Sequence, residues 1–142
     1  MMIMVVDGQG GGIGKALIEK LLPILTEDIT LIAVGTNSQA TANMLKAGHL
    51  SGATGENAIV YNAKQADLIV GSIGIIAANS MLGELSPKMA QAISQSNAIK
   101  ILIPLNMCNL RIVGGNCTSL PQKIEDATNM IKVWIHSEKD HC

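Results

Sequence analysis

Aromatic side chains are almost missing from this chain of 142 residues, which has no phenylalanine, one tyrosine and one tryptophan. Hydrophobic residues still make up 48% of it, so its core must be built from Ile, Leu, Val, Ala and Met. Aliphatic cores of this kind suit parallel strands that are buried on both faces. The length is that of one domain and allows a hydrophobic core without disulfides or metals. We therefore expect a single domain over residues 1–142.

A surplus of positive charge is also missing. The formal net charge is −1, charged residues make up 15% of the chain, and the lysines are scattered along it. Proteins that bind nucleic acid usually neutralise its phosphates with a cluster of basic side chains. We therefore expect no nucleic-acid partner.

Cysteine is scarce, and the sequence shows no segment typical of export or membrane insertion. Cys108, Cys117 and Cys142 are an odd number without a C-x-x-C pair, which favours a reducing compartment. The first apolar run has neither a basic region before it nor a cleavage site after it, unlike a signal peptide. The longest apolar stretch, LIVGSIGIIAANSML, is interrupted by polar residues and is too short to span a bilayer. We therefore expect a cytoplasmic protein without a membrane partner.

Glycine, by contrast, is concentrated near the start of the chain. The sequence begins MMIMVVDGQGGGIGKALIEKLL, with five glycines between positions 8 and 14. Such density indicates a sharp turn or a close approach of the backbone to another group, because glycine adds nothing to a core. A strand, a glycine turn and a helix follow in that order, which directs free N–H groups and the positive end of a helix dipole to one spot. This arrangement predicts a phosphate site.

Apolar periodicity predicts alternating strands and helices. Strands are expected at residues 2–6, 29–34, 58–61, 67–71, 100–103 and 110–113. Helices are expected at residues 13–22, 38–47, 62–66 and 120–136, and as one helix or a pair within 76–95, where Ser86 and Pro87 give a start signal. The connection before residues 110–113 is too short for a parallel crossover, so this strand should pair antiparallel. The predicted fold is an α/β, three-layer Rossmann-like open sheet, mostly parallel (order 3-2-1-4-5) with an antiparallel edge strand.

Ligands bind such sheets beyond the carboxyl ends of the strands, where the strand order reverses. Here the reversal lies between the first and fourth strands, and a glycine turn follows each of them. We expect a nucleotide or another phosphate-bearing small molecule there. The expected binding residues are Gly8, Gly10, Gly11, Gly12, Ile13, Gly14, Gly35, Thr36, Asn37, Gly71, Ser72 and Gly74.

The first glycine turn resembles a known cofactor loop. It matches G-x-x-x-G-x-G with Gly8, Gly12 and Gly14, and with the following GGGIGKALIEKL it resembles the loop of the short-chain dehydrogenases/reductases. The segments VGTN (34–37) and DLIVGSIGI (67–75) are similar to later parts of that family. The resemblance implies a nicotinamide dinucleotide, NADP or NAD, as cofactor.

Two departures from that family's pattern bear on ligand and activity. No acid stands at the end of the second strand to bind the ribose 2′-hydroxyl, which favours NADP by default, with Lys15, Thr36 or Asn37 facing the extra phosphate. The family's Tyr-x-x-x-Lys pair is absent, because Tyr61 and Lys64 are one residue too close. We therefore do not expect an oxidoreductase of the short-chain type.

The chain as a whole resembles a second group, the short bacterial proteins of unknown function with a DGQGGG motif near the amino terminus. This resemblance extends over nearly the whole chain and includes GATGENAIVYNAKQADLIVGSIGIIAANSMLGE. It implies a bacterial, cytoplasmic origin and no particular activity.

Individual polar residues allow more than one role. Asp7 either accepts N–H groups of the glycine turn or holds Mg²⁺ against ligand phosphates. Cys108 is either a small buried turn residue or a nucleophile activated by a neighbouring base. His49 is either a solvated loop residue or a ligand contact. Cys117 has no histidine nearby in the sequence, so a metal site there is not expected.

Three classes of function remain open at this point. The first is a small Rossmann-like protein that binds a nucleotide or dinucleotide, and it is the one that we favour, as a homo-oligomer. The second is a structural or interaction module in which the glycines only allow close packing and the apolar run 73–85 forms an interface between copies. The third is an enzyme that acts on a phosphorylated small molecule through Cys108 or Asp7.

Overall fold

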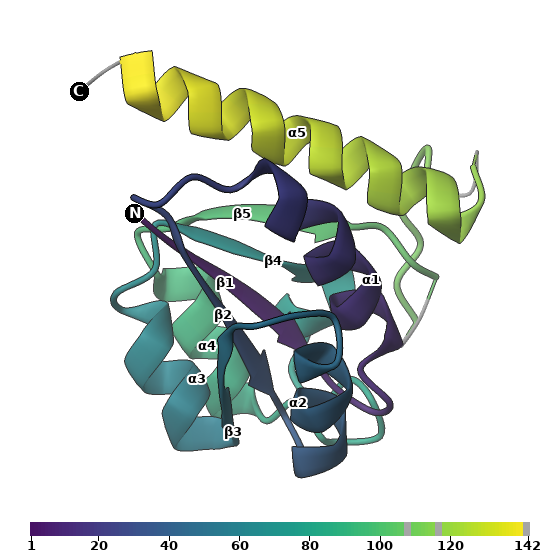
Figure 1. Cartoon of the computed structure of the whole chain (residues 1–142). Coiled ribbons are helices and arrows are strands. Elements are labelled where there is room, and N and C mark those ends of the chain that lie inside the picture. The colour runs from purple at the N-terminus through teal and green to yellow at the C-terminus, as the bar shows by residue number, and fades with distance from the viewer. Residues whose placement is uncertain (107–108, 116–117, 141–142) are drawn as a thin grey trace.

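The computed structural model of the chain describes residues 1–106, 109–115 and 118–140. A five-stranded sheet of order β3-β2-β1-β4-β5 forms the middle layer, and helices cover both of its faces (Figure 1). The strands are β1 Met2–Asp7, β2 Thr30–Gly35, β3 Ser51–Thr54, β4 Leu68–Ser72 and β5 Ile99–Ile103. The helices are α1 Gly12–Leu21, α2 Ser38–Leu45, α3 Glu56–Ala63, α4 Pro87–Gln95 and α5 Leu120–Asp140, with 3-10 turns η1 Leu22–Ile24 and η2 Ile73–Ile76.

The aliphatic core lies in two layers, one on each face of the sheet. Successive residues of a strand point to opposite faces, so Ile3 and Val5 of β1 pack with α1, α2 and α5. Met4 and Val6 pack with α3 and α4 on the other face. Burial on both faces explains why the central strands are continuous apolar runs. The strand order and the α/β class are as predicted.

The antiparallel edge strand is wrong, because every strand pair of the described sheet is parallel. Residues 110–113 contain no strand. The chain turns there instead, and the N–H of Gly115 donates to the carbonyl of Ile112 at 2.9 Å. Val113 is fully exposed, so the apolar character of this run reflects neither a strand nor the core.

The third strand was also predicted in the wrong place. Residues 58–61 lie within α3, where Ile59 and Ala63 are four residues apart and are both buried against the sheet. The real third strand, β3, is an edge strand with the sequence SGAT, which has no apolar alternation to reveal it. Gly55 separates the two elements with φ of 101°, a backbone conformation that glycine adopts readily.

Only the end of the region 76–95 forms a regular α-helix. The helix α4 begins at Pro87, and the side chain of Ser86 accepts a hydrogen bond from the N–H of Met89, so the predicted start signal is confirmed. Residues 77–86, here called the 77–86 segment, take an irregular path between η2 and α4. The other elements differ from prediction mainly at their ends. None of the described helices has the length and apolar character needed to cross a membrane.

Candidate functional site

The turn between β1 and α1 lies where the strand order reverses, and neighbouring residues hold it tightly. The N–H of Gly11 donates to the carbonyl of Gly8 at 2.9 Å. From the α2 side, the Asn37 amide donates to the carbonyl of Gln9 at 3.0 Å, and the Asn43 amide donates to that of Gly10 at 2.8 Å. The turn is therefore a fixed structure rather than a loose loop.

Asp7 supports this turn from within the protein. Its side chain is only 7% exposed. One carboxylate oxygen accepts the N–H of Gly8 at 2.8 Å, and the other accepts that of Gly14 at 2.7 Å. Burial raises the pKa of Asp7, and these backbone hydrogen bonds partly oppose the rise. Both oxygens already bond to the turn, which supports the role of Asp7 as its acceptor.

Several glycines of the site are required by packing. A Cβ atom on Gly11 would lie 2.6 Å from the carbonyl oxygen of Ala40, and the φ of Gly11 is 73°. On Gly14 it would collide with Met44, and on Gly35 with Thr41. On Gly71 it would lie 2.7 Å from the carbonyl oxygen of Val6 in β1. These glycines let the turn, the helices and the strands approach each other closely.

Gly10 and Gly12 differ from these glycines. Both are exposed, neither has a positive φ, and an added Cβ atom would meet nothing within 4 Å at either position. Among the described residues, their N–H groups also have no hydrogen-bond partner. The fold itself therefore does not require glycine at these two positions.

Glu84, which the sequence analysis did not single out, extends into the same place from the 77–86 segment. Its Oε1 atom accepts the N–H of Gln9 at 3.0 Å, the Thr36 hydroxyl at 2.7 Å and the Asn37 amide at 2.7 Å. The hydrogen bond from Gln9 is the largest cause that lowers the pKa of Glu84, and the bond from Thr36 follows. The nearest signal in the sequence was Gly83, which has a φ of 92° within this irregular segment.

The segment that carries Glu84 has an unusual backbone. Asn79, Met81 and Leu82 have φ values of 65°, 59° and 57°, a region that side chains other than Gly and Asn rarely adopt. Such strain persists only where the surroundings enforce it. Met81 and Leu85 are buried in the core, and the N–H of Asn79 donates to the carbonyl of Leu85 at 2.7 Å. Glu84 is therefore held in place by its own segment.

The structure brings Thr36 and Asn37 to the glycine turn, as expected, but it places the second glycine turn differently. Gly71, Ser72 and Gly74 are all buried. The Ser72 hydroxyl oxygen accepts the N–H of Gly74 at 3.3 Å, where β4 leads into η2. These three residues form the closely packed base of the site rather than an open wall.

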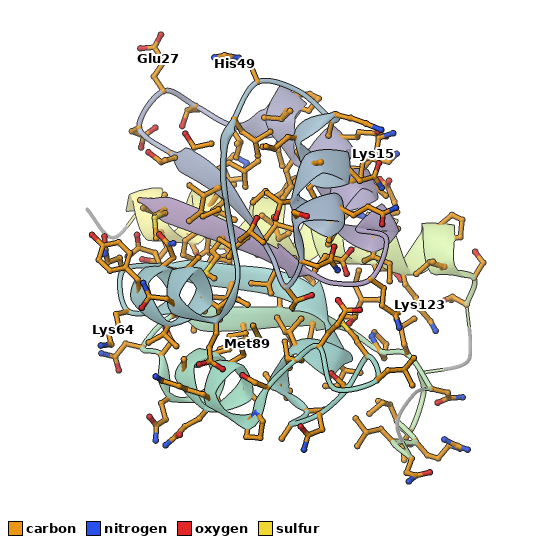
Figure 2. All side chains as sticks on the ribbon, turned by 90° about the horizontal axis from the view of Figure 1, so that it is seen from below. Lys15, Glu27, His49, Lys64, Met89 and Lys123 are labelled. Carbon is orange, nitrogen blue, oxygen red and sulfur yellow. The ribbon has the colours of Figure 1, made fainter. Side chains whose placement is uncertain are left out.

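Other predicted residues lie apart from the turn or outside the described part of the chain. His49 lies two residues before the start of β3, near the amino ends of the parallel strands, and its side chain points away from the body of the molecule (Figure 2). Cys108 and Cys117 fall outside the described residues. Within the described ranges, no three His, Cys, Asp or Glu side chains gather as a metal site.

The apolar run 73–85 is used within the chain itself. Ile75, Met81 and Leu85 are buried in the core layer beneath α3 and α4. Only Ile76 and Leu82 are exposed among its large apolar side chains. An interface between copies is thus not needed to explain this run.

A hollow of about 420 Å³ borders the open side of the turn, between the first turns of α1 and α5. Its wall includes Gly12, Ile13 and Ala16 from α1, and Leu120 and Ile124 from α5. The size falls in the range of small-molecule sites, and most of its lining is apolar. A ligand that touches Gly12 therefore has apolar surface next to it.

The charge of Glu84 should make stability depend on pH. Its pKa is lowered from an ordinary value of 4.5, so its stabilising contribution is present above that pH and is lost as the pH falls through the folded-state pKa. The variant Glu84→Gln lacks this contribution. It keeps Asp7, whose pKa is shifted in the opposite direction, so the comparison with the wild type isolates Glu84. Urea unfolding should show a constant difference in free energy between the two proteins near neutral pH and a shrinking one in acid. A difference that grows in acid would contradict this assignment.

One comparison with known proteins gave a match. A family model described as a domain of unknown function (DUF3842) matches residues 2–136. No curated protein matches the chain significantly. The family match spans the whole sheet and the glycine turn, and its description assigns no activity.

Proposed function

The chain belongs to the family DUF3842, a domain of unknown function, and we propose that it binds the phosphate groups of a nucleotide or dinucleotide at the turn between β1 and α1. The N–H groups of Gly10 and Gly12 and the first turn of α1 bind the phosphate. NAD and NADP are the cofactor class that we propose. Magnesium is not part of the proposal, because both oxygens of Asp7 already accept hydrogen bonds.

The observation that carries the proposal is the pair of unhindered glycines. Every other glycine of this turn would collide with a neighbour if it gained a side chain, but Gly10 and Gly12 would not. Glycine costs chain entropy on folding, so its presence at two open positions needs another cause. A phosphate group that lies directly on the backbone supplies that cause, since any side chain there would hold it away.

Electrostatic attraction and repulsion both act on an anion at this side of the turn. Hydrogen bonds to a charged group contribute about 1.5–3 kcal/mol each, and a helix amino terminus adds roughly 0.3–1 kcal/mol. Two carboxylates, Asp7 and Glu84, oppose this attraction; at 4 Å the repulsion is about 1 kcal/mol in bulk water and roughly 4 kcal/mol near a protein surface. The N–H groups of Gly8 and Gly14 on Asp7, and that of Gln9 on Glu84, offset part of this repulsion.

The hollow beside Gly12 suits the remaining part of such a ligand. Its lining by Ile13, Ala16 and Leu120 is apolar, as a base or a nicotinamide ring requires. Lys20 also lines the hollow, and its ammonium group forms an ion pair with Glu125 at 3.2 Å. A homo-oligomer stays a prediction from the sequence, and nothing in the proposed site depends on a second copy.

Ligand-dependent stabilisation tests this proposal. A ligand that binds only the folded state raises its melting temperature. We expect NAD, NADP or a simpler nucleotide to raise it for the wild type at millimolar concentration and to leave Gly12→Val unchanged, because the valine side chain would occupy the phosphate position. Circular dichroism should show the same secondary structure in both proteins.

The matched control is Gln91→Val, which places the same side chain on an exposed position of α4. This variant should respond to ligand like the wild type. Absence of any shift across the nucleotides, or a full shift in Gly12→Val, would refute phosphate binding at this turn.

A further inference from the structure

The carboxylate of Glu84 lies beside the end of β2, a strand that provides no acid of its own. In dinucleotide-binding sheets, an acid at this place binds the ribose 2′-hydroxyl of the ligand. Here β2 ends at Gly35 and continues with Thr36 and Asn37, which are both neutral. The Oε1 atom of Glu84 lies 2.7 Å from the Thr36 hydroxyl and 2.7 Å from the Asn37 amide nitrogen. The tertiary structure thus supplies the acid that the second strand lacks.

The two oxygens of this carboxylate are used unequally. Oε1 accepts all three hydrogen bonds from Gln9, Thr36 and Asn37. Among the described residues, Oε2 has no hydrogen-bond partner. A carboxylate oxygen accepts hydrogen bonds only, so the groups that it can bind are donors such as hydroxyls.

The position of Glu84 is also set before any ligand arrives. The carboxylate is bonded to the turn and to the end of β2, and its segment is anchored by the buried side chains of Met81 and Leu85. A receptor group that is already in place loses little conformational entropy when it binds. This distinguishes Glu84 from a mobile surface carboxylate.

We propose, on the basis of the phosphate-binding function above, that Oε2 of Glu84 binds the 2′- and 3′-hydroxyls of the ligand's adenosine ribose. The ligand class is then a nucleotide or dinucleotide with an unmodified ribose, such as NAD. A 2′-phosphate would bring a second negative charge against the carboxylate. This reverses the preference for NADP that the sequence suggested, because the acid comes from the segment after β4 and not from the end of β2.

The test compares NAD with NADP, which differ only in the 2′-phosphate. Equilibrium dialysis or calorimetry on the wild type should give an affinity for NAD about tenfold or more above that for NADP, the factor expected for one close pair of like charges. In Glu84→Gln, which keeps an acceptor for Gln9 and Thr36, this ratio should fall towards one, mainly through tighter binding of NADP. The matched control is Glu56→Gln. It removes a carboxylate that bonds to Ser86 of the same segment, at 2.6 Å, and should leave the ratio unchanged.

The outcomes separate this inference from the function on which it rests. Equal affinity for both ligands in the wild type, or an unchanged ratio in Glu84→Gln, would overturn the role of Glu84 while phosphate binding stands. Binding of neither ligand would overturn both proposals. The comparison in the wild type needs no variant, so equal affinity there would overturn the role of Glu84 even where Glu84→Gln does not fold.

Discussion

Alanine at position 11 is expected to lower the free energy of unfolding by about 2–5 kcal/mol, while alanine at the adjacent position 12 leaves it unchanged or slightly higher. The Cβ atom on Gly11 would lie 2.6 Å from the carbonyl oxygen of Ala40, and its φ of 73° is unfavourable for any side chain. Backbone atoms of α2 cannot rotate away as a side chain could. Gly12 lies in helical conformation with open space around it, so alanine there reduces chain entropy in the unfolded state at no steric cost.

Urea unfolding of the two variants beside the wild type measures this contrast. The variants differ by one position and carry the same added methyl group, so each serves as control for the other. Similar losses in both would mean that the whole turn, and not the contact with Ala40, limits stability. Tolerance of Gly11→Ala would show that α2 can move away from the turn.

Truncation of Leu85 to alanine should cost about 2–5 kcal/mol of unfolding free energy, as is usual for a fully buried leucine. Its side chain is 0% exposed and lies in the core layer with Ile75, Met89 and Ile93. The loss also loosens the segment that holds Glu84, so the preference for NAD over NADP should weaken in the same variant. Thermal unfolding and the two-ligand comparison would record both effects.

Leu82 is the matched control within the same segment. It is 99% exposed and has a φ of 57°, so it contributes no core contact and holds a strained backbone. Glycine there relieves the strain but increases unfolded-state entropy, and the net result should be a gain of up to about 1 kcal/mol. A loss for Leu82→Gly comparable to that for Leu85→Ala would show that Leu82 contacts something in solution.

Local chemistry was sufficient to predict much of the fold. The apolar runs of β1, β2, β4 and β5 are long enough to form buried strands and are bounded by turn residues. Their alternation with helices predicted that these strands pair in parallel. The start of α4 could be predicted because Ser86 and Pro87 are residues that helix starts prefer, and this preference depends only on neighbours in the sequence. Predictions of this kind succeed because burial of a strand on both faces leaves an apolar pattern that depends little on distant parts of the chain.

The two wrong predictions have different causes. β3 consists of Ser, Gly, Ala and Thr at the edge of the sheet, where pairing with β2 and not apolar burial defines the strand. Residues 110–113 are apolar but turn on themselves after β5, so composition alone suggested an edge strand that does not form. The conformation of β3 is decided by a strand that is remote in sequence, whereas residues 110–113 lead into a local turn.

The sequence by itself determined that the β1–α1 turn is built of glycine and lies at the reversal of an α/β sheet, because strand and helix periodicities meet there. It could not tell which glycines serve packing and which are open. For Gly11 and Gly14 that division depends on Ala40 and Met44 of α2, which the sheet places against the turn. Nor could it place Glu84, 75 residues from Gln9, at the end of β2. Only tertiary contacts bring such groups together, because local patterns carry no information on which distant side chains meet.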